Sequence, residues 1–107
     1  MEIQSHRDLI VWQRAIELSV GVYELTRQFP GEETYGMSSQ MRRAAVSVAS
    51  NIAEGYGRAS TGEYVQFLGI ARGSNPELQT QMVIARRLRI GNTEKLDQTE
   101  AFSGRSV

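Results

Sequence analysis

The apolar residues in the first third of the chain recur every three or four positions, which is the spacing of an amphipathic helix. They are Leu9, Trp12, Ile16, Val22 and Tyr23, and the stripe is widened by Leu18, Leu25 and Phe29. Ser5 followed three residues later by Asp8 is typical of a capping box, and Pro30-Gly31 is a stop signal. The pattern predicts one long helix over residues 9–29.

A second helix is predicted from Ser38, which can cap it, to the glycines at positions 55 and 57. Its inward positions are expected to be Met37, Met41, Ala44, Ala45, Val48 and Ile52. Alanines at positions 45, 49 and 53 make one face small, so a neighbouring helix can approach closely. This face favours tight helix packing over a ligand cavity.

A third helix is predicted from a capping box formed by Ser60 and Glu63. Its inward residues are expected to be Tyr64, Phe67, Leu68, Ala71, Leu78, Met82, Ala85 and Leu88. Pro76 lies inside this segment, where it cannot donate a hydrogen bond to the carbonyl of Arg72. Because the apolar spacing continues in phase after the proline, we expect one kinked helix rather than two.

The last segment has the weakest pattern. Gly91 separates it from the third helix, Asn92 or Thr93 can cap it, and few apolar residues follow. We therefore expect a short or frayed fourth helix. Since no alternation typical of strands is found, the predicted fold is all-α, an up-and-down four-helix bundle in a single domain over residues 1–107.

Composition restricts the chemistry. With 107 residues, no cysteine and one histidine, His6, the chain offers no disulfide, no thiolate nucleophile and no cysteine-based zinc site. No calcium-binding loop or phosphate-binding glycine loop is recognisable, so we expect no metal, no cofactor and no small-molecule substrate. No apolar run reaches the ~18–20 residues that span a bilayer, so we expect a cytoplasmic protein without a membrane partner.

Three runs in the second and third predicted helices resemble a known family. They are QMRRAAVSVASNIAEG at 40–55, EYVQFL at 63–68 and ARGS at 71–74, supported by ELQTQ at 77–81. In this order and spacing they are similar to the 23S rRNA intervening-sequence proteins, over roughly residues 7–90. The chain departs from the family pattern at Asn75-Pro76 and in its short last helix.

The resemblance implies a four-helix bundle that oligomerises into a homo-oligomeric ring, a pentamer, encoded in some bacteria within insertions of the large ribosomal RNA gene. The accessory proteins of diversity-generating retroelements are similar in fold and use basic surfaces that contact RNA and a reverse transcriptase. The resemblance therefore implies self-association and RNA as partners of this chain.

Positive charge is the candidate RNA-binding chemistry. Twelve Lys and Arg balance twelve Asp and Glu, so any RNA site must be a local patch. The concentrations of arginine are Arg42, Arg43, Arg58, Arg86, Arg87 and Arg89. The last three have an alternative explanation, because cations are favoured near a helix C-terminus. A ring would repeat such a patch, so that its contacts act multivalently on one RNA.

Trp12 and Tyr23 are candidate anchors of the oligomer interface, since aromatic residues on an apolar stripe pack in cores and subunit contacts more often than they stack on bases. Few other aromatic residues are expected to be exposed. Any RNA binding should therefore show little sequence preference.

A strip of Ser47, Asn51 and Glu54 on one face of the second helix is interpreted as a structural polar network, tied to the third helix through Arg72. The alternative is a hydrolase using Glu54. No histidine or cysteine is close in sequence to support such catalysis.

These observations predict no catalytic residue and favour a non-catalytic oligomeric scaffold or adaptor that binds RNA. The main alternative is a purely protein-binding structural module, which the zero net charge favours.

Overall fold

The computed structural model describes residues 4–58 and 61–103, apart from the side chains at positions 63, 67–74 and 103. Within these residues the chain forms the helices α1 (Ile10–Thr26), α2 (Met37–Tyr56), α3 (Thr61–Leu88) and α4 (Thr93–Ser103). Two short 3-10 turns are added, η1 (His6–Asp8) before α1 and η2 (Gly31–Glu33) before α2. The described part contains no strand, so the prediction of an all-α protein is confirmed.

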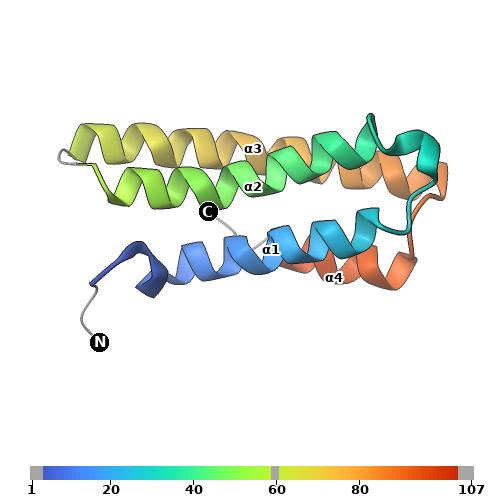
Figure 1. Cartoon of the computed structure of the whole chain (residues 1–107), viewed down its shortest axis with the longest axis horizontal. Coiled ribbons are helices and arrows are strands. Elements are labelled where there is room, and N and C mark those ends of the chain that lie inside the picture. Colours follow the sequence, from blue (N-terminus) through green and yellow to red (C-terminus); the bar gives the residue numbers. More distant parts are fainter. Residues whose placement is uncertain (1–3, 59–60, 104–107) are drawn as a thin grey trace.

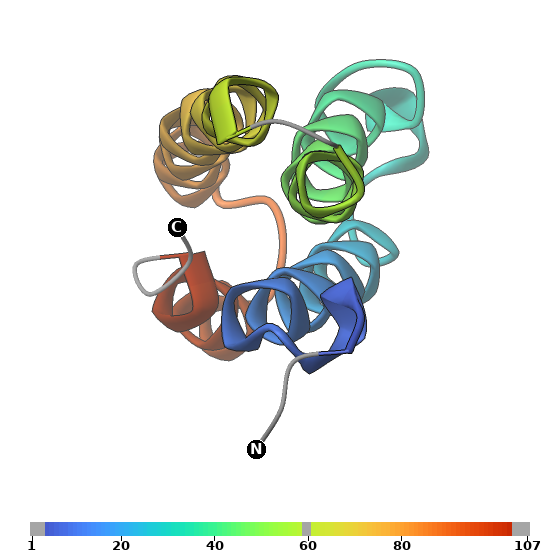
Figure 2. The same ribbon diagram turned by 90° about the vertical axis from the view of Figure 1, so that its left-hand side faces the viewer.

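Successive helices run in opposite directions, as an up-and-down bundle requires (Figure 1). Seen along the bundle, the order around it is α1, α2, α3 and α4 (Figure 2). Each helix packs against its two neighbours, and in the described part of the chain the Cα atoms of diagonal helices do not come within 8 Å of each other. With 11 residues against 17 to 28 in the others, α4 covers only part of the bundle length, as the sequence predicts.

The predicted capping box at the N-terminus is present, but it caps η1 rather than α1. The Ser5 hydroxyl accepts a hydrogen bond from the Arg7 N–H, and the Asp8 carboxylate accepts one from the Ser5 N–H. The helix α1 begins two residues later and ends at Thr26, before the predicted end. Beyond that point the backbone makes i+3 turn bonds, yet Phe29 remains buried.

The prediction that Ser38 caps α2 is wrong. The helix begins at Met37 after Gly36, and Ser38 is buried in its first turn. The Glu33 carboxylate, held in the preceding turn η2, accepts the hydrogen bond of the Met37 N–H at 3.3 Å. A carboxylate suits this end of a helix, where backbone N–H groups point outward.

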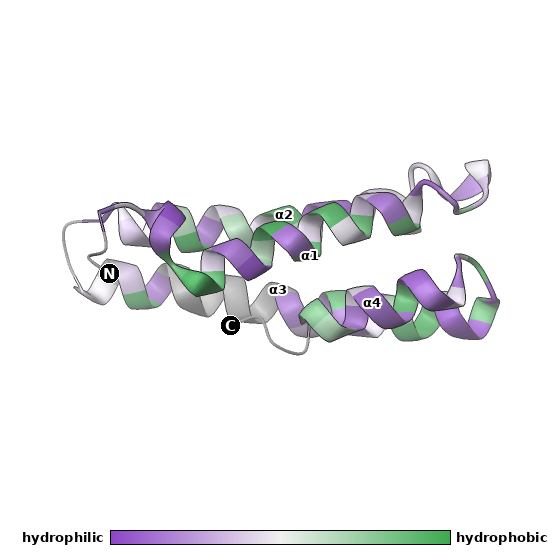
Figure 3. Cartoon of the chain, turned by 90° about the horizontal axis from the view of Figure 1, so that it is seen from below, coloured by the Kyte–Doolittle hydropathy of each residue, from purple (hydrophilic) through white to green (hydrophobic). Residues whose placement is uncertain are grey.

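The core has two parts that follow the bundle axis. The larger contains Leu18, Val22, Leu25, Phe29, Met41, Ala44, Ala45, Leu78, Met82, Ala85 and Leu96. The smaller, toward the N-terminal end of α1, contains Ala15, Val48, Ala49 and Ile52. The inward positions predicted for α2 are confirmed. Hydrophobic and hydrophilic segments alternate along the helices, as expected for amphipathic helices around one core (Figure 3).

The helix α3 continues through Pro76 as one helix, which confirms the expected single element. The predicted capping box of Ser60 and Glu63 lies outside the described residues and side chains. Of the predicted inward residues, Leu78, Met82 and Ala85 are buried, and Phe67, Leu68 and Ala71 lie outside the described side chains. The prediction for Leu88 is wrong, because this residue is exposed. The backbone reverses directly after it, and Ile90 packs against the core in its place.

This reversal ends α3 and starts α4. Arg89 and Gly91 both have positive φ, at +58° and +86°. The Ile90 N–H bonds to the Ala85 carbonyl and the Arg89 N–H to the Arg86 carbonyl, a pattern that satisfies the last free carbonyls of a helix. Asn92 then caps α4, as predicted, by accepting the Lys95 N–H at 3.0 Å.

Candidate functional site

The helix α1 carries a second apolar row that faces away from the core. Ile16, Val20 and Tyr23 recur at helical spacing, and their side chains are 37%, 52% and 38% exposed. We call these three residues the outer ridge of α1. An exposed apolar row on a surface helix marks a place that another protein surface can cover.

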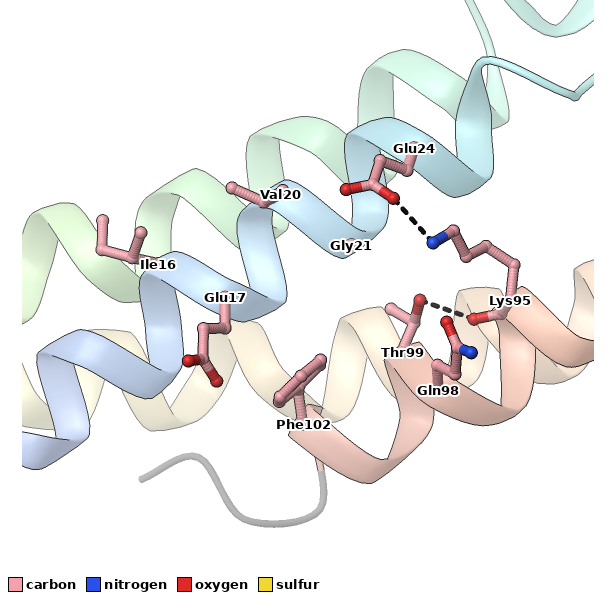
Figure 4. Close-up of a pocket in the computed structure, with 9 residues that line it drawn as sticks. All are labelled: Ile16, Glu17, Val20, Gly21, Glu24, Lys95, Gln98, Thr99 and Phe102. Carbon is pink, nitrogen blue, oxygen red and sulfur yellow. Dashed lines mark hydrogen bonds and ion pairs between the residues drawn. The ribbon is translucent and has the colours of Figure 1, made fainter.

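A groove of about 280 Å³ lies between the outer ridge and α4 (Figure 4). Its apolar lining comes from Ile16 and Val20 on α1 and Phe102 on α4. At one end the Lys95 ammonium group contacts the Glu24 carboxylate at 2.6 Å. The hydrogen bond and the charge of Lys95 lower the pKa of Glu24.

The two helices approach closely at the floor of this groove. A Cβ atom on Gly21 would lie 3.3 Å from the hydroxyl of Thr99, which is buried and donates a hydrogen bond to the Lys95 carbonyl. The glycine therefore provides the space that Thr99 occupies. Because the short α4 lies this close to α1, the outer ridge stands beside a concave surface rather than on a flat one.

A second exposed apolar surface lies on α3. Val83, Ile84 and Leu88 are exposed there, between 41% and 60% of their surface. We call them the outer face of α3. The helices α1 and α3 lie diagonally across the bundle (Figure 2), and each set of residues is exposed on its own helix, so the outer ridge and the outer face belong to different sides of the molecule.

The two predicted interface anchors lie in different places. Tyr23 belongs to the outer ridge. Trp12 is half-buried against the smaller core cluster, and its ring meets the edge of His6 at 5.1 Å between centroids. Trp12 therefore packs largely within its own subunit.

The predicted arginines divide by their partners, and Arg86 is paired with two carboxylates. Its guanidinium group donates to the Asp97 carboxylate at 2.8 Å and to the Glu100 carboxylate at 3.0 Å. These bonds, that to Glu100 first, raise the pKa of Arg86. Arg86 thus ties α3 to α4, and its charge is balanced within the chain.

Arg58 is also paired, with the Glu54 carboxylate one turn earlier on α2. Arg87 and Arg89 are exposed near the C-terminal end of α3. In the described part of the chain neither of these two contacts a carboxylate.

Arg42 is held in place by α1. Its guanidinium carbon lies 4.6 Å from the centre of the Tyr23 ring, and its Nε donates to the Thr26 hydroxyl at 2.8 Å. Thr26 is buried and in turn donates to the Val22 carbonyl at 2.7 Å. This chain of contacts leaves the two terminal nitrogens of Arg42 for other acceptors.

Arg42 and Arg43 line a hollow of about 530 Å³ with Tyr23 and Tyr35. Tyr35 lies in the connector before α2, and 96% of its surface is exposed. Neither arginine contacts a carboxylate within the described residues. The hollow therefore combines two uncompensated positive charges with two tyrosines, and we call it the arginine-tyrosine hollow.

The predicted polar strip is partly present. The Asn51 side-chain amide donates to the Ser47 carbonyl at 2.8 Å and to the Ser47 hydroxyl at 3.0 Å. Glu54 is directed to Arg58 instead. The side chain of Arg72 lies outside the described ones, so the link to α3 stays a prediction. No group of three His, Asp or Glu that could hold a metal ion occurs in the described part.

Sequence reasoning did not single out Tyr35, Val20 or Phe102. Tyr35 is an aromatic residue in a connector of glycine, threonine and glutamate, without apolar partners at helical spacing, and this was the available signal. Val20 shares a helix face with Ile16 and Tyr23, which the sequence assigned to the apolar stripe of the first helix but which the structure shows to be exposed. Phe102 gave no signal, since its contact with α1 depends on how α4 folds back.

A family model described as 23S rRNA-intervening sequence protein matches residues 7–103. No curated protein matches the chain significantly. None of the described helices is both long and apolar enough to cross a membrane.

Proposed function

Since the chain belongs to the family of 23S rRNA-intervening sequence proteins, we propose that it is a non-catalytic cytoplasmic scaffold that closes into a homo-oligomeric ring and holds RNA on its surface arginines. The observation that carries this proposal is the pair of exposed apolar surfaces on diagonal helices. The arginine-tyrosine hollow supports the RNA part.

Two different surfaces per subunit suit a ring. In a ring every subunit uses one surface toward one neighbour and another surface toward the next, whereas a two-fold dimer uses the same surface twice. The outer ridge of α1 and the outer face of α3 provide two such surfaces. The ridge stands beside the groove with α4, so a convex apolar face of a neighbour has a hollow to enter. A pentamer, which the family resemblance implies, is one ring that such contacts between neighbouring subunits could close.

The RNA part is supported by the unbalanced arginines. Arg58 and Arg86 are neutralised by carboxylates, so their charge contributes little to an RNA site. Arg42, Arg43, Arg87 and Arg89 lack such partners in the described residues, and a ring repeats them. Phosphate contacts of this kind act mainly through charge and are salt-dependent.

A mixing experiment with two single variants tests the ring. Val20→Asp places a charge on the outer ridge, and Ile84→Asp places one on the outer face of α3. Both residues are exposed in the subunit, so each variant should fold and each should be a monomer by light scattering. An equimolar mixture still has one intact pair of surfaces and should form a dimer of one Val20→Asp and one Ile84→Asp subunit.

Ile10→Asp is the matched control, because Ile10 is exposed but lies on neither surface. It should assemble like the wild type. A monomeric wild type at micromolar concentration would contradict the ring. So would an Ile84→Asp variant that still dimerises, because that result indicates a two-fold contact between outer ridges.

A purely protein-binding scaffold is the second candidate. The zero net charge and the internal pairing of Arg58 and Arg86 favour it. Fluorescence anisotropy with labelled single-stranded RNA separates the two candidates: salt-dependent binding supports the RNA scaffold, and no binding at low salt leaves the protein-only scaffold.

A further inference from the structure

We infer that the arginine-tyrosine hollow is a nucleotide site for single-stranded RNA, in which Tyr35 stacks on a base while Arg42 and Arg43 hold the adjoining phosphates. This inference rests on the proposed RNA scaffold and assigns it a specific contact. The ligand class is an unpaired ribonucleotide segment, recognised by backbone charge and a base face.

The positive charges in the hollow are available to an anion. Arg42 and Arg43 have no carboxylate partner in the described part of the chain, whereas Arg58, Arg86 and Lys95 are each paired with one there. A guanidinium group binds phosphate oxygens through parallel N–H donors. Arg42 retains its terminal N–H groups for this role, because only its Nε is used by Thr26.

Arg42 is also preorganised. The ring of Tyr23 lies under its guanidinium group, and the buried Thr26 fixes Nε from the side of α1. A side chain that is already ordered loses less conformational freedom when a ligand binds. Arg42 therefore differs from the exposed Arg87, for which no such contacts are found among the described residues.

Tyr35 favours RNA over an acidic protein as the ligand of the hollow. Its ring is almost fully exposed and packs against no core residue, so the fold gains nothing evident from an aromatic residue at this position. Exposed aromatic rings beside arginines are the means by which proteins hold unpaired bases. The volume of about 530 Å³ lies in the ~300–1,000 Å³ range of ligand sites.

Tyr35 and Tyr23 are the aromatic residues that are exposed among the described side chains, in agreement with the expectation that few such residues are available. The expected weak sequence preference is unchanged. Stacking tolerates every base, since each has an aromatic face.

The test uses the full chain and a short fluorescein-labelled oligouridylate, titrated by anisotropy at several salt concentrations. Tyr35→Ala should weaken binding roughly 5- to 150-fold, because stacking contributes ~1–3 kcal/mol per base, and it should leave the salt slope unchanged. Tyr35→Phe keeps the ring and should bind like the wild type. Arg43→Ala should reduce the slope of log affinity against log salt by about 0.7.

Ile10→Ala is the control for an exposed apolar side chain outside the hollow, and it should have no effect. The oligonucleotide should also crosslink through 5-iodouridine to Tyr35, as located by mass spectrometry. If the wild type binds the oligonucleotide in a salt-dependent way but Tyr35→Ala binds equally well, the nucleotide site is wrong while the RNA scaffold stands. If the wild type binds no RNA at low salt, both are wrong. Displacement of the oligonucleotide by polyglutamate at equal charge concentration would assign the hollow to an acidic protein and overturn the inference.

Discussion

At the scale of single residues, Gly91 should tolerate a side chain poorly. Its φ of +86° is strained for other residues, and a Cβ atom would lie 2.7 Å from Phe29 Cε1 and 3.0 Å from Leu25 Cδ1. We expect Gly91→Ala to lower the free energy of unfolding by about 2–4 kcal/mol, from backbone strain and overpacking together. Urea denaturation followed by circular dichroism measures the change.

Gly31→Ala is the matched control for this prediction, because a Cβ atom there meets nothing within 4 Å. It should change the unfolding free energy by less than about 0.5 kcal/mol, as surface substitutions usually do. Equal effects of the two substitutions would show that the tight contact with Phe29 does not contribute.

The sequence identified the arginines but not all of their partners. The pair of Glu54 and Arg58 could be found, since the two residues stand four apart on one helix. The partners of Arg86 could not, because Asp97 and Glu100 reach it only after the chain has turned from α3 into α4. The helical pattern does not show how the chain turns between α3 and α4. The sequence alone therefore did not reveal that Arg86 is paired with these carboxylates.

At the scale of elements, α4 should be held to α1 in a pH-dependent way. The pKa of Glu24 is lowered by its hydrogen bond with Lys95. A carboxyl group whose pKa is lower in the folded than in the unfolded protein stabilises the fold above its ordinary pKa, and this contribution disappears as the pH falls through the lowered value. Lys95→Met keeps the apolar stem and removes the charge. The melting temperature of this variant should be lower than that of the wild type at neutral pH, and the two melting temperatures should become equal in acid.

The control is Lys95→Arg, which keeps a cation opposite Glu24 and should retain the pH dependence. The prediction would be contradicted if the melting temperature of Lys95→Met were lower than that of the wild type by the same amount at every pH. The loss of stability would then come from packing rather than from charge.

Helical periodicity was sufficient to find all four helices, including the continuation of α3 past Pro76. It was less reliable at their ends. The apolar stripe of α1 continues to Phe29 although the helix stops at Thr26, because a buried side chain needs a position in space rather than a helical backbone. Ser38 was a plausible cap, but it is buried within the first turn, and Glu33 accepts the Met37 N–H from outside the helix.

At the scale of the whole molecule, the ring and the RNA site should act together. Val20→Asp removes a ring contact but leaves every arginine in place. On a long single-stranded RNA it should lose about 10²–10⁴-fold in affinity, because the subunits no longer bind one strand simultaneously. On an oligonucleotide that fits a single subunit, anisotropy should give the same affinity for Val20→Asp and wild type.

Ile10→Asp is again the control, with wild-type affinity for both RNA lengths. Equal losses on the short and the long RNA would indicate that Val20 contacts the RNA itself. The sequence could predict that α1 and α3 retain uncovered apolar residues. Which residues face outward depends on how each helix is rotated against its neighbours, and that rotation is set by packing across the bundle.

The close contact between Gly21 and Thr99 also has a consequence for the order of folding. The helix pairs α1–α2 and α2–α3 join neighbours along the chain, whereas α1–α4 joins its two ends. Closing a longer loop costs more chain entropy, and distant contacts therefore form later. We expect α4 to dock last, onto a hairpin pair that already exists. Until it does, the groove beside the outer ridge is incomplete, so subunits should fold before they assemble.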